Sequence, residues 1–207
     1  MKDNLRSVYL WYARDQKILP KLVKDMPEMS LLRVLKLRNI HIEDVAVSIA
    51  SEDTDLKSPL MALEELKLAY CDIAMDFPTC PKLKSFTLKE NWIYDSEGSV
   101  RKSILNQGES LERLVFFRHY TPYDNQGFLE LIQGCRKLIY LKLAIRKVKF
   151  TLDFVREIVD ILKENGLQPN DPLELVLDQY FKFKWLRHWL SLTANSELIR
   201  LRLENVI

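Results

Sequence analysis

The sequence predicts an α/β solenoid, with a parallel β-sheet on its concave face and helices and loops on its convex face. Three observations support this prediction. A short apolar pattern recurs along the chain at fairly regular steps, which is typical of a repeat architecture. Several segments between its copies carry the three-to-four-residue periodicity of helices. The 207 residues are also 47% hydrophobic, which is the composition of a folded chain.

The recurring pattern is apolar-x-x-apolar-x-apolar, as in Leu32, Leu35 and Leu37. It occurs eight times, and only the seventh copy departs from it, with Pro172 in the first position. The middle residues of the copies lie at positions 8, 35, 66, 86, 114, 141, 175 and 201. Most steps between them fall within or near the roughly 20–29 residues of leucine-rich repeats. We therefore predict a leucine-rich-repeat horseshoe.

Each copy is predicted to form one short strand, with its last two apolar residues in the core and the alternate residues pointing outward. The strands are expected near residues 7–11, 34–38, 65–69, 85–89, 113–117, 140–144, 174–178 and 200–204. Together they define a single solenoid domain over residues 1–207. Equivalent residues on adjacent strands should lie about 4.8 Å apart, so that the outward side chains form rows.

Helices are predicted in six of the connecting segments, at residues 16–26, 43–50, 96–106, 128–134, 152–164 and 181–193. Thr151 should cap the fifth helix, because its hydroxyl can accept a hydrogen bond from the Phe154 N–H, and Gly166 follows the helix end. The buried face of this helix is expected to hold Phe154, Ile158, Ile161 and Leu162. The segment 69–82 is too short for a helix, and its prolines favour turns or extended chain.

Two copies carry a cysteine three residues before the first leucine, as Cys80-Pro-Lys-Leu83 and Cys135-Arg-Lys-Leu138. The second copy follows Leu129-Glu-Leu-Ile-Gln-Gly134. This arrangement resembles the cysteine-containing leucine-rich repeats of F-box proteins, in which a helix ends in Gly-Cys and leads into a CxxLxxLxL strand. The resemblance covers almost the whole chain. It implies a protein-interaction module that recognises substrates for an SCF complex, and hence for ubiquitin-dependent degradation.

The resemblance does not extend to the F-box, which precedes the repeats in that family. Leu5 already belongs to the first predicted repeat, and Leu19-Pro20 is not followed by the rest of an F-box. A cullin adaptor is therefore an expected partner only if an F-box lies upstream in the full protein. We also expect both ends to be uncapped, because neither carries a polar terminal repeat, so that further repeats or another chain would cover them.

The outward positions of the predicted strands are the best candidates for partner binding. Among them we count eight basic and four acidic residues, so this surface is more basic than the chain, whose net charge is +2. The candidate partner-binding residues are Tyr9, Trp11, Lys36, Arg38, Lys67, Lys89, Arg113, Phe117, Tyr140, Lys142, Arg200 and Arg202. A basic strip with exposed aromatic residues suits a protein that carries an acidic or phosphorylated segment. The alternative interpretation is that the lysines and arginines simply solvate the sheet.

Two further functions stay open. The basic strip could bind nucleic acid or another phosphate-bearing ligand, with its cations on phosphates and Tyr9 or Trp11 stacked on bases, although nucleic acid is the less favoured partner. Regulation of a small GTPase, or another scaffold role, rests on the predicted fold alone.

No catalytic motif, cofactor site or metal site is expected. The chain lacks a Gly-rich phosphate loop, a GxSxG turn and an HExxH helix, and His41, His119 and His188 fall in different repeats. The three cysteines lack metal-ligand spacing and are expected to be packing residues. Scattered cysteines, early charges and the lack of a long apolar run predict a cytoplasmic or nuclear protein. A net charge of only +2 and the lack of a spanning segment predict that it has no membrane partner.

Overall fold

A computed structural model describes residues 5–11, 31–39, 60–71, 77, 79–89, 99–117, 123–143 and 147–204. Within these ranges the chain is an α/β protein built from parallel strands and helices. It divides into two compact units, Met1–Ser110 and Leu111–Ile207, each of which is described by itself. The helices predicted at residues 16–26 and 43–50 lie outside the described residues.

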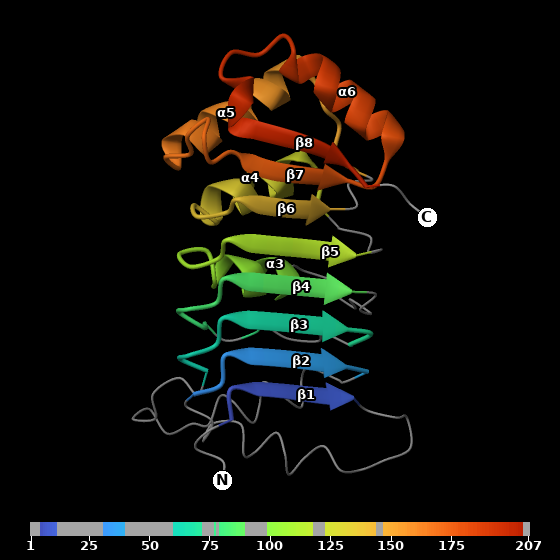
Figure 1. Cartoon of the computed structure of the whole chain (residues 1–207). Helices are drawn as coiled ribbons and strands as arrows, with labels where there is room; N and C mark the ends of the chain where they lie inside the picture. The colour runs from blue at the N-terminus through green and yellow to red at the C-terminus, as the bar shows by residue number, and fades with distance from the viewer. Residues whose placement is uncertain are drawn as a thin grey trace. The chain divides into compact units, whose positions relative to one another are not determined.

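The first unit contains four parallel strands in chain order (Figure 1), which are β1 (Ser7–Trp11), β2 (Val34–Arg38), β3 (Glu65–Ala69) and β4 (Ser85–Lys89). These are the bounds predicted from the repeat. The strands pair in register, so that Leu35 lies beside Leu66 and Leu66 beside Phe86. Helix α3 (Ser99–Leu105) follows β4 and lies within the helix predicted at residues 96–106.

Alternate burial along the strands explains their register. In β2, Leu35 and Leu37 are fully buried, whereas Lys36 is partly exposed and Arg38 is exposed. Complete burial of one leucine side chain stabilises a fold by about 1.5–3 kcal/mol. A slip of one residue would turn the leucines of a strand outward and its charged residues inward, so the apolar pattern itself fixes the pairing.

A recurring backbone arrangement sets the start of the strands. The Arg33 and Val34 N–H groups both donate to the carbonyl oxygen of Arg6, at 2.9 and 3.0 Å. The same arrangement recurs for Glu64 and Glu65 on Arg33, for Lys84 and Ser85 on Glu64, and, in the second unit, for Ile139 and Tyr140 on Glu112. In each case the chain is aligned on its neighbour just before the strand begins.

Two buried polar side chains near α3 support the connection between β3 and β4. Ser103 Oγ accepts a hydrogen bond of 2.7 Å from the Phe77 N–H, and Gln107 Oε1 accepts one of 2.7 Å from the Cys80 N–H. Gln107 Nε2 in turn donates to the Ser103 carbonyl at 3.2 Å. Because a buried backbone N–H without a partner is costly, these side chains supply what a helix or sheet would otherwise provide there.

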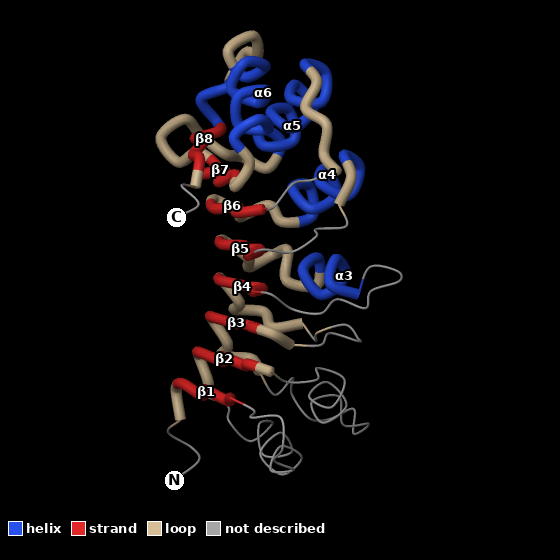
Figure 2. The backbone as a smooth tube through the Cα atoms, turned by 90° about the vertical axis from the view of Figure 1, so that its right-hand side faces the viewer, coloured by secondary structure: helices blue, strands red, loops and turns tan. Residues whose placement is uncertain are grey.

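The second unit also has four parallel strands in chain order, which are β5 (Arg113–Phe117), β6 (Tyr140–Leu143), β7 (Leu173–Leu177) and β8 (Ile199–Leu203). They are connected by α4 (Asn125–Gly134), α5 (Leu152–Glu164), α6 (Tyr180–Leu190) and the 3-10 helix η3 (Ser196–Leu198). Figure 2 shows α4 and α5 beside one face of these strands. Strands β7 and β8 begin one residue earlier than predicted, because Leu173 and Ile199 already pair with each other.

Helix α5 has the bounds that the sequence predicted. Thr151 Oγ1 accepts a hydrogen bond of 3.3 Å from the Phe154 N–H, which confirms the N-cap, and Gly166 follows the helix with a φ of +86°. Its buried residues are Phe154, Val155, Ile158, Val159 and Leu162. Ile161, which was expected among them, is only partly buried, so the packed face includes the two valines instead.

Helix α4 begins three residues before the predicted start, at Asn125 instead of residue 128. The preceding Asp124 accepts a hydrogen bond of 3.0 Å from the Gly127 N–H, a cap that the apolar periodicity did not reveal. Helix α6 ends at Leu190, three residues before the predicted end at residue 193. Among the described helices, none combines the length and the apolar character needed to cross a membrane.

Candidate interaction surfaces

The outward side of β1, β2 and β3 carries aligned basic and aromatic residues. The register places Tyr9 beside Lys36 and Lys36 beside Lys67, and in the next row Trp11 lies beside Arg38. Tyr9 and Trp11 are 67% and 68% exposed. We define the unit-1 face as Tyr9, Trp11, Lys36, Arg38, Lys67 and Tyr70.

Arg38 lies between two aromatic rings of the unit-1 face. Its guanidinium carbon is 5.6 Å from the centre of the Trp11 ring and 5.0 Å from that of the Tyr70 ring. Each such contact at an exposed site stabilises by about 0.5–1 kcal/mol. The rings thus restrict the arginine, whose planar set of N–H donors matches the paired oxygens of a carboxylate or phosphate.

Tyr70 was not among the residues predicted from the strand pattern. It follows the last residue of β3 and has a φ of +56°, in the left-handed region, as does Asn39 after β2. The Tyr70 N–H donates to the carbonyl oxygen of Lys89 at 2.8 Å, which holds this turn against the neighbouring strand. The strand pattern assigns a side of the sheet only to residues within a strand. Tyr70 lies in the turn after β3, so its position near Arg38 could not be predicted from that pattern.

The lysines of the unit-1 face differ in their surroundings. Lys36 Nζ lies 3.1 Å from Glu65 Oε1, and because both side chains are partly exposed this pair contributes roughly 0–1 kcal/mol. Lys67 forms no ion pair with any residue that the structure describes. Lys89 lies on β4, where it pairs in register with Ala69, and is partly exposed. Because the Lys36–Glu65 pair contributes little, an acidic ligand can replace Glu65 as the partner of Lys36.

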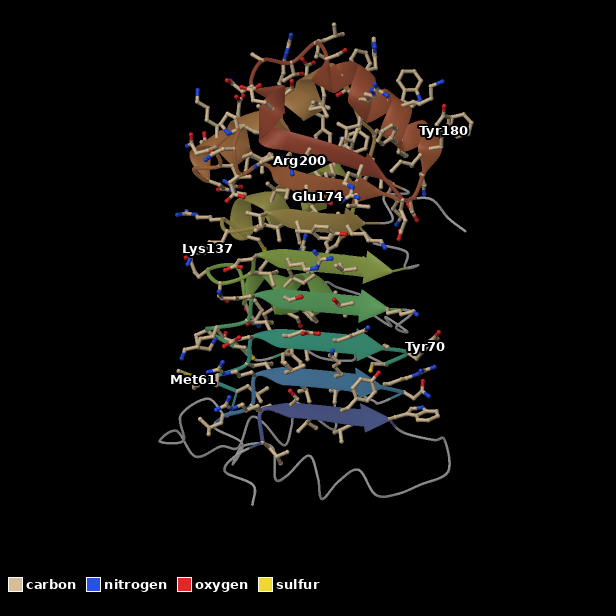
Figure 3. All side chains as sticks on the ribbon, viewed as in Figure 1. Met61, Tyr70, Lys137, Glu174, Tyr180 and Arg200 are labelled. Carbon is tan, nitrogen blue, oxygen red and sulfur yellow. The ribbon has the colours of Figure 1, made fainter. Side chains whose placement is uncertain are left out.

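Two basic residues on the outward side of the second unit form ion pairs within the protein. Lys142 is only 8% exposed, and its Nζ lies 2.5 Å from Glu204 Oε1. Arg202 Nη1 lies 2.7 Å from Glu174 Oε1. Glu174 also pairs in register with Arg200, and Figure 3 shows these two residues on adjacent strands. Each of these acidic groups offsets a nearby cation.

The remaining predicted residues of the second unit are two arginines and two aromatic residues, Arg113, Arg200, Phe117 and Tyr140. The guanidinium carbon of Arg113 lies 3.5 Å from the centre of the Tyr140 ring, so the arginine covers the partly exposed tyrosine. Arg200 is exposed. Phe117 ends β5, but its side chain lies outside the described residues. Of the twelve candidates, the structure therefore gathers Tyr9, Trp11, Lys36, Arg38 and Lys67 into one face, with Lys89 on the next strand.

A cleft of about 500 Å³ opens on the surface of the second unit. Its lining residues include Glu112, Arg136, Lys137, Asn165 and Asp171. It was not predicted from the sequence, because its lining combines the segments that precede β5, β6 and β7 with the end of α5. Its cations and carboxylates are mixed, so its charge favours no particular class of ligand.

The cysteines have the properties of packing residues. All three are buried and form no disulfide, and burial raises the pKa of Cys80 and of Cys135 to about 12. A thiol with such a pKa is almost entirely protonated at neutral pH and is a poor nucleophile and metal ligand. In the described part of the chain, no group of three or more His, Cys, Asp and Glu residues is arranged to hold a metal ion. His188 is exposed on α6, while His41 and His119 lie outside the described residues.

A scan against protein-family models and searches of curated proteins and solved structures found no match to this chain.

Proposed function

We propose that the chain is a leucine-rich-repeat module that binds another protein and is not an enzyme. The in-register copies of the apolar pattern support a repeat, as does the backbone arrangement that recurs at Arg6, Arg33, Glu64 and Glu112. In such a solenoid each repeat packs mainly on its neighbours, and the strand side offers a broad surface to a partner. The F-box-like Gly-Cys sequence at Gly134 and Cys135 supports the substrate-recognition part of an F-box protein as the specific type.

The unit-1 face is the proposed binding surface, and its ligand is an acidic or phosphorylated protein segment. One observation carries this proposal: Arg38 is held between Trp11 and Tyr70, with Lys36 and Lys67 on the adjoining row. Tryptophan, tyrosine and arginine are the residues that most often dominate the free energy of binding at protein interfaces. The second unit offers a weaker candidate, because Lys142 is almost completely buried in its pair with Glu204 and Arg202 lies 2.7 Å from Glu174.

An array of acidic peptides, each in phosphorylated and unphosphorylated form, tests this proposal with the whole chain as the probe. Replacing Arg38 or Trp11 with alanine should weaken binding to the selected peptides by about tenfold or more, the usual effect at a central interface residue. Arg33→Ala is the matched control, since Arg33 is also an exposed arginine of the first unit but is absent from the unit-1 face. Equal binding by all three variants would show that this face is not the binding surface.

The ubiquitin-related part of the proposal needs a separate experiment. We infer that the full protein recruits a cullin adaptor if an F-box is encoded ahead of these repeats, and that it acts in the cytoplasm or nucleus. The full-length protein should then retrieve the adaptor, whereas this chain alone should not. A full transcript without an F-box segment would remove the ligase role and leave the interaction module.

Nucleic acid is a second candidate ligand for the same face. The row that joins Tyr9, Lys36 and Lys67 carries both a ring for stacking and cations for phosphates. Binding to single-stranded RNA or DNA would fall steeply with salt, because each phosphate contact releases counterions. A peptide complex held by Trp11 and Arg38 would be less salt-dependent, so a salt titration distinguishes the two ligands.

A further inference from the structure

Helix α6 has an outer side rich in exposed aromatic and apolar residues. Phe181 is 77% exposed, Tyr180 and Trp185 are each more than half exposed, and so is Leu192, two residues beyond the end of the helix. Phe181 and Trp185 are four residues apart and share one side of the helix, and Tyr180 lies at the edge of the same side. The opposite side carries Leu186 and Leu190, which are buried. The exposed stripe is therefore additional to the packing that holds the helix in place.

The same helix is strongly basic. From Tyr180 to Leu190 it contains Lys182, Lys184 and Arg187 and no acidic residue. Lys184 Nζ lies 5.5 Å from the centre of the Tyr180 ring, so cations and aromatic residues are interleaved on this surface.

Basic residues of a neighbouring segment extend this charge. Lys182 Nζ donates a hydrogen bond to the Val148 carbonyl oxygen, which ties α6 to the segment that contains Lys147 and Lys149. Burial lowers the pKa of Lys182, and the nearby charge of Lys149 lowers it further. The two lysines are thus close enough to repel each other. Like charges gathered in this way favour an anionic partner.

We propose that this α6 surface, formed by Tyr180, Phe181, Lys184, Trp185, Arg187 and Leu192, docks on an anionic lipid membrane. Aromatic side chains that protrude from a basic helix are suited to the boundary between headgroups and acyl chains, where rings enter the interface and cations meet phosphate. Phe181 projects into solvent from the helix, as insertion into a soft interface requires.

This proposal goes beyond the protein-binding function and uses a different surface. It also departs from the sequence-based expectation of no membrane partner. That expectation rested on a net charge of only +2 and on the lack of a spanning segment. A near-neutral total does not exclude a local basic cluster, and peripheral docking needs no spanning helix.

Sedimentation of the whole chain with large unilamellar vesicles tests the proposal. Vesicles of phosphatidylcholine with 30% phosphatidylserine should bind the chain, whereas pure phosphatidylcholine vesicles should bind it much more weakly, because each basic residue near an anionic surface strengthens binding by about fivefold. Phe181→Ala should reduce the partition coefficient by about tenfold, the effect of removing a large apolar side chain. Lys184→Glu should reduce the partition coefficient by at least about fivefold, the effect of losing one cation near the anionic surface.

Two variants of the second unit serve as matched controls, Ile139→Ala for the apolar change and Lys137→Glu for the charge reversal. Both residues are exposed and lie outside the α6 surface. Neither variant should change vesicle binding, and far-ultraviolet circular dichroism should be the same for all four proteins. Equal binding to both vesicle types, or equal loss in the control variants, would overturn the proposal. Binding to a polyglutamate peptide or to single-stranded DNA that exceeds binding to the vesicles would also overturn it.

Discussion

Lys142 on β6 and Glu204, the residue after β8, form an ion pair of 2.5 Å that spans the intervening strand β7. Lys142 is almost completely buried, whereas the Glu204 side chain keeps about a third of its exposure. The pair therefore joins strands that are not neighbours in the sheet. It also removes from solvent one of the cations that the sequence pattern placed on the outward surface.

Breaking this pair should destabilise the protein. Glu204→Ala leaves the buried ammonium group of Lys142 without this carboxylate, and we expect the free energy of unfolding to fall by about 1–2 kcal/mol, discounted for the partial exposure of Glu204. Replacing both residues, as Lys142→Met with Glu204→Leu, should be close to neutral because no buried charge is left over. Urea unfolding monitored by circular dichroism measures both. If Glu204→Ala leaves the free energy of unfolding unchanged, the Lys142–Glu204 ion pair does not stabilise the protein.

The buried hydroxyl of Ser103 provides a second stability test. Ser103→Ala removes the acceptor of the Phe77 N–H, and the cost of an unsatisfied buried donor is about 1–3 kcal/mol. Hydrogen exchange at the Phe77 amide should also become faster. Lys102→Ala is the control, since Lys102 is an exposed residue of the same helix and should change stability by less than about 0.5 kcal/mol. If Ser103→Ala unfolds at the same urea concentration as the unaltered protein, the hydrogen bond from the Phe77 N–H to Ser103 does not contribute to stability.

The buried thiols should be nearly inert in the folded protein. Burial raises the pKa of Cys80 and Cys135 from an ordinary value of 9.0 to about 12, so their thiolate fraction at pH 8 falls roughly a thousandfold. Alkylation by iodoacetamide, located by mass spectrometry, should therefore be slow in buffer and fast in concentrated urea.

The same shift has a consequence for stability at high pH. Because the folded-state pKa exceeds the unfolded one, the neutral thiols contribute their full stability below pH 9, and this contribution is lost as the pH rises from 9 to about 12. Rapid alkylation of either cysteine in the folded chain at pH 8 would contradict both statements.

Replacing Gly166 with alanine should lower the stability of the protein, whereas replacing a glycine within a helix should not. Gly166 has a φ of +86°, and a Cβ there would meet no neighbouring atom, so the cost of Gly166→Ala is backbone strain alone, about 1 kcal/mol. Gly134→Ala is the matched control: Gly134 is the last residue of α4, where alanine is favoured. Thermal unfolding should show a lower Tm for the first variant and an unchanged or higher Tm for the second. The reverse order would show that Gly166 does not need its left-handed conformation.

The strands could be predicted from the sequence because two signals coincide in each of them. Alternate burial requires the apolar pattern that Leu35 and Leu37 display, and the pattern recurs at steps that place the copies in register. Helix α5 was predicted for a similar reason, since its cap at Thr151 and its apolar spacing agree. Helix α4 was placed less well, because its start depends on a single hydrogen bond from Gly127 to Asp124.

The candidate surface was predicted less completely, because exposure and pairing depend on residues distant in sequence. The strand pattern identified Trp11 and Arg38 as outward residues but could not indicate that Tyr70 lies beside Arg38. It also treated Lys142 and Lys67 alike, although Glu204 neutralises only Lys142. Phe181 and Trp185 lay within the helix predicted at residues 181–193, whereas Tyr180 lay just before it, and the exposure of all three depends on which side Leu186 and Leu190 pack.

The carbonyl oxygens of Arg6, Arg33 and Glu64 each accept two hydrogen bonds from the start of the following strand, and so set where that strand begins. The length of the connecting segment has no part in that alignment. Insertions and deletions between strands can therefore accumulate during evolution while the rows of surface side chains keep their spacing. Recognition in such a chain can change one strand at a time, by substitution at a position such as Lys36 or Lys67, without a new backbone.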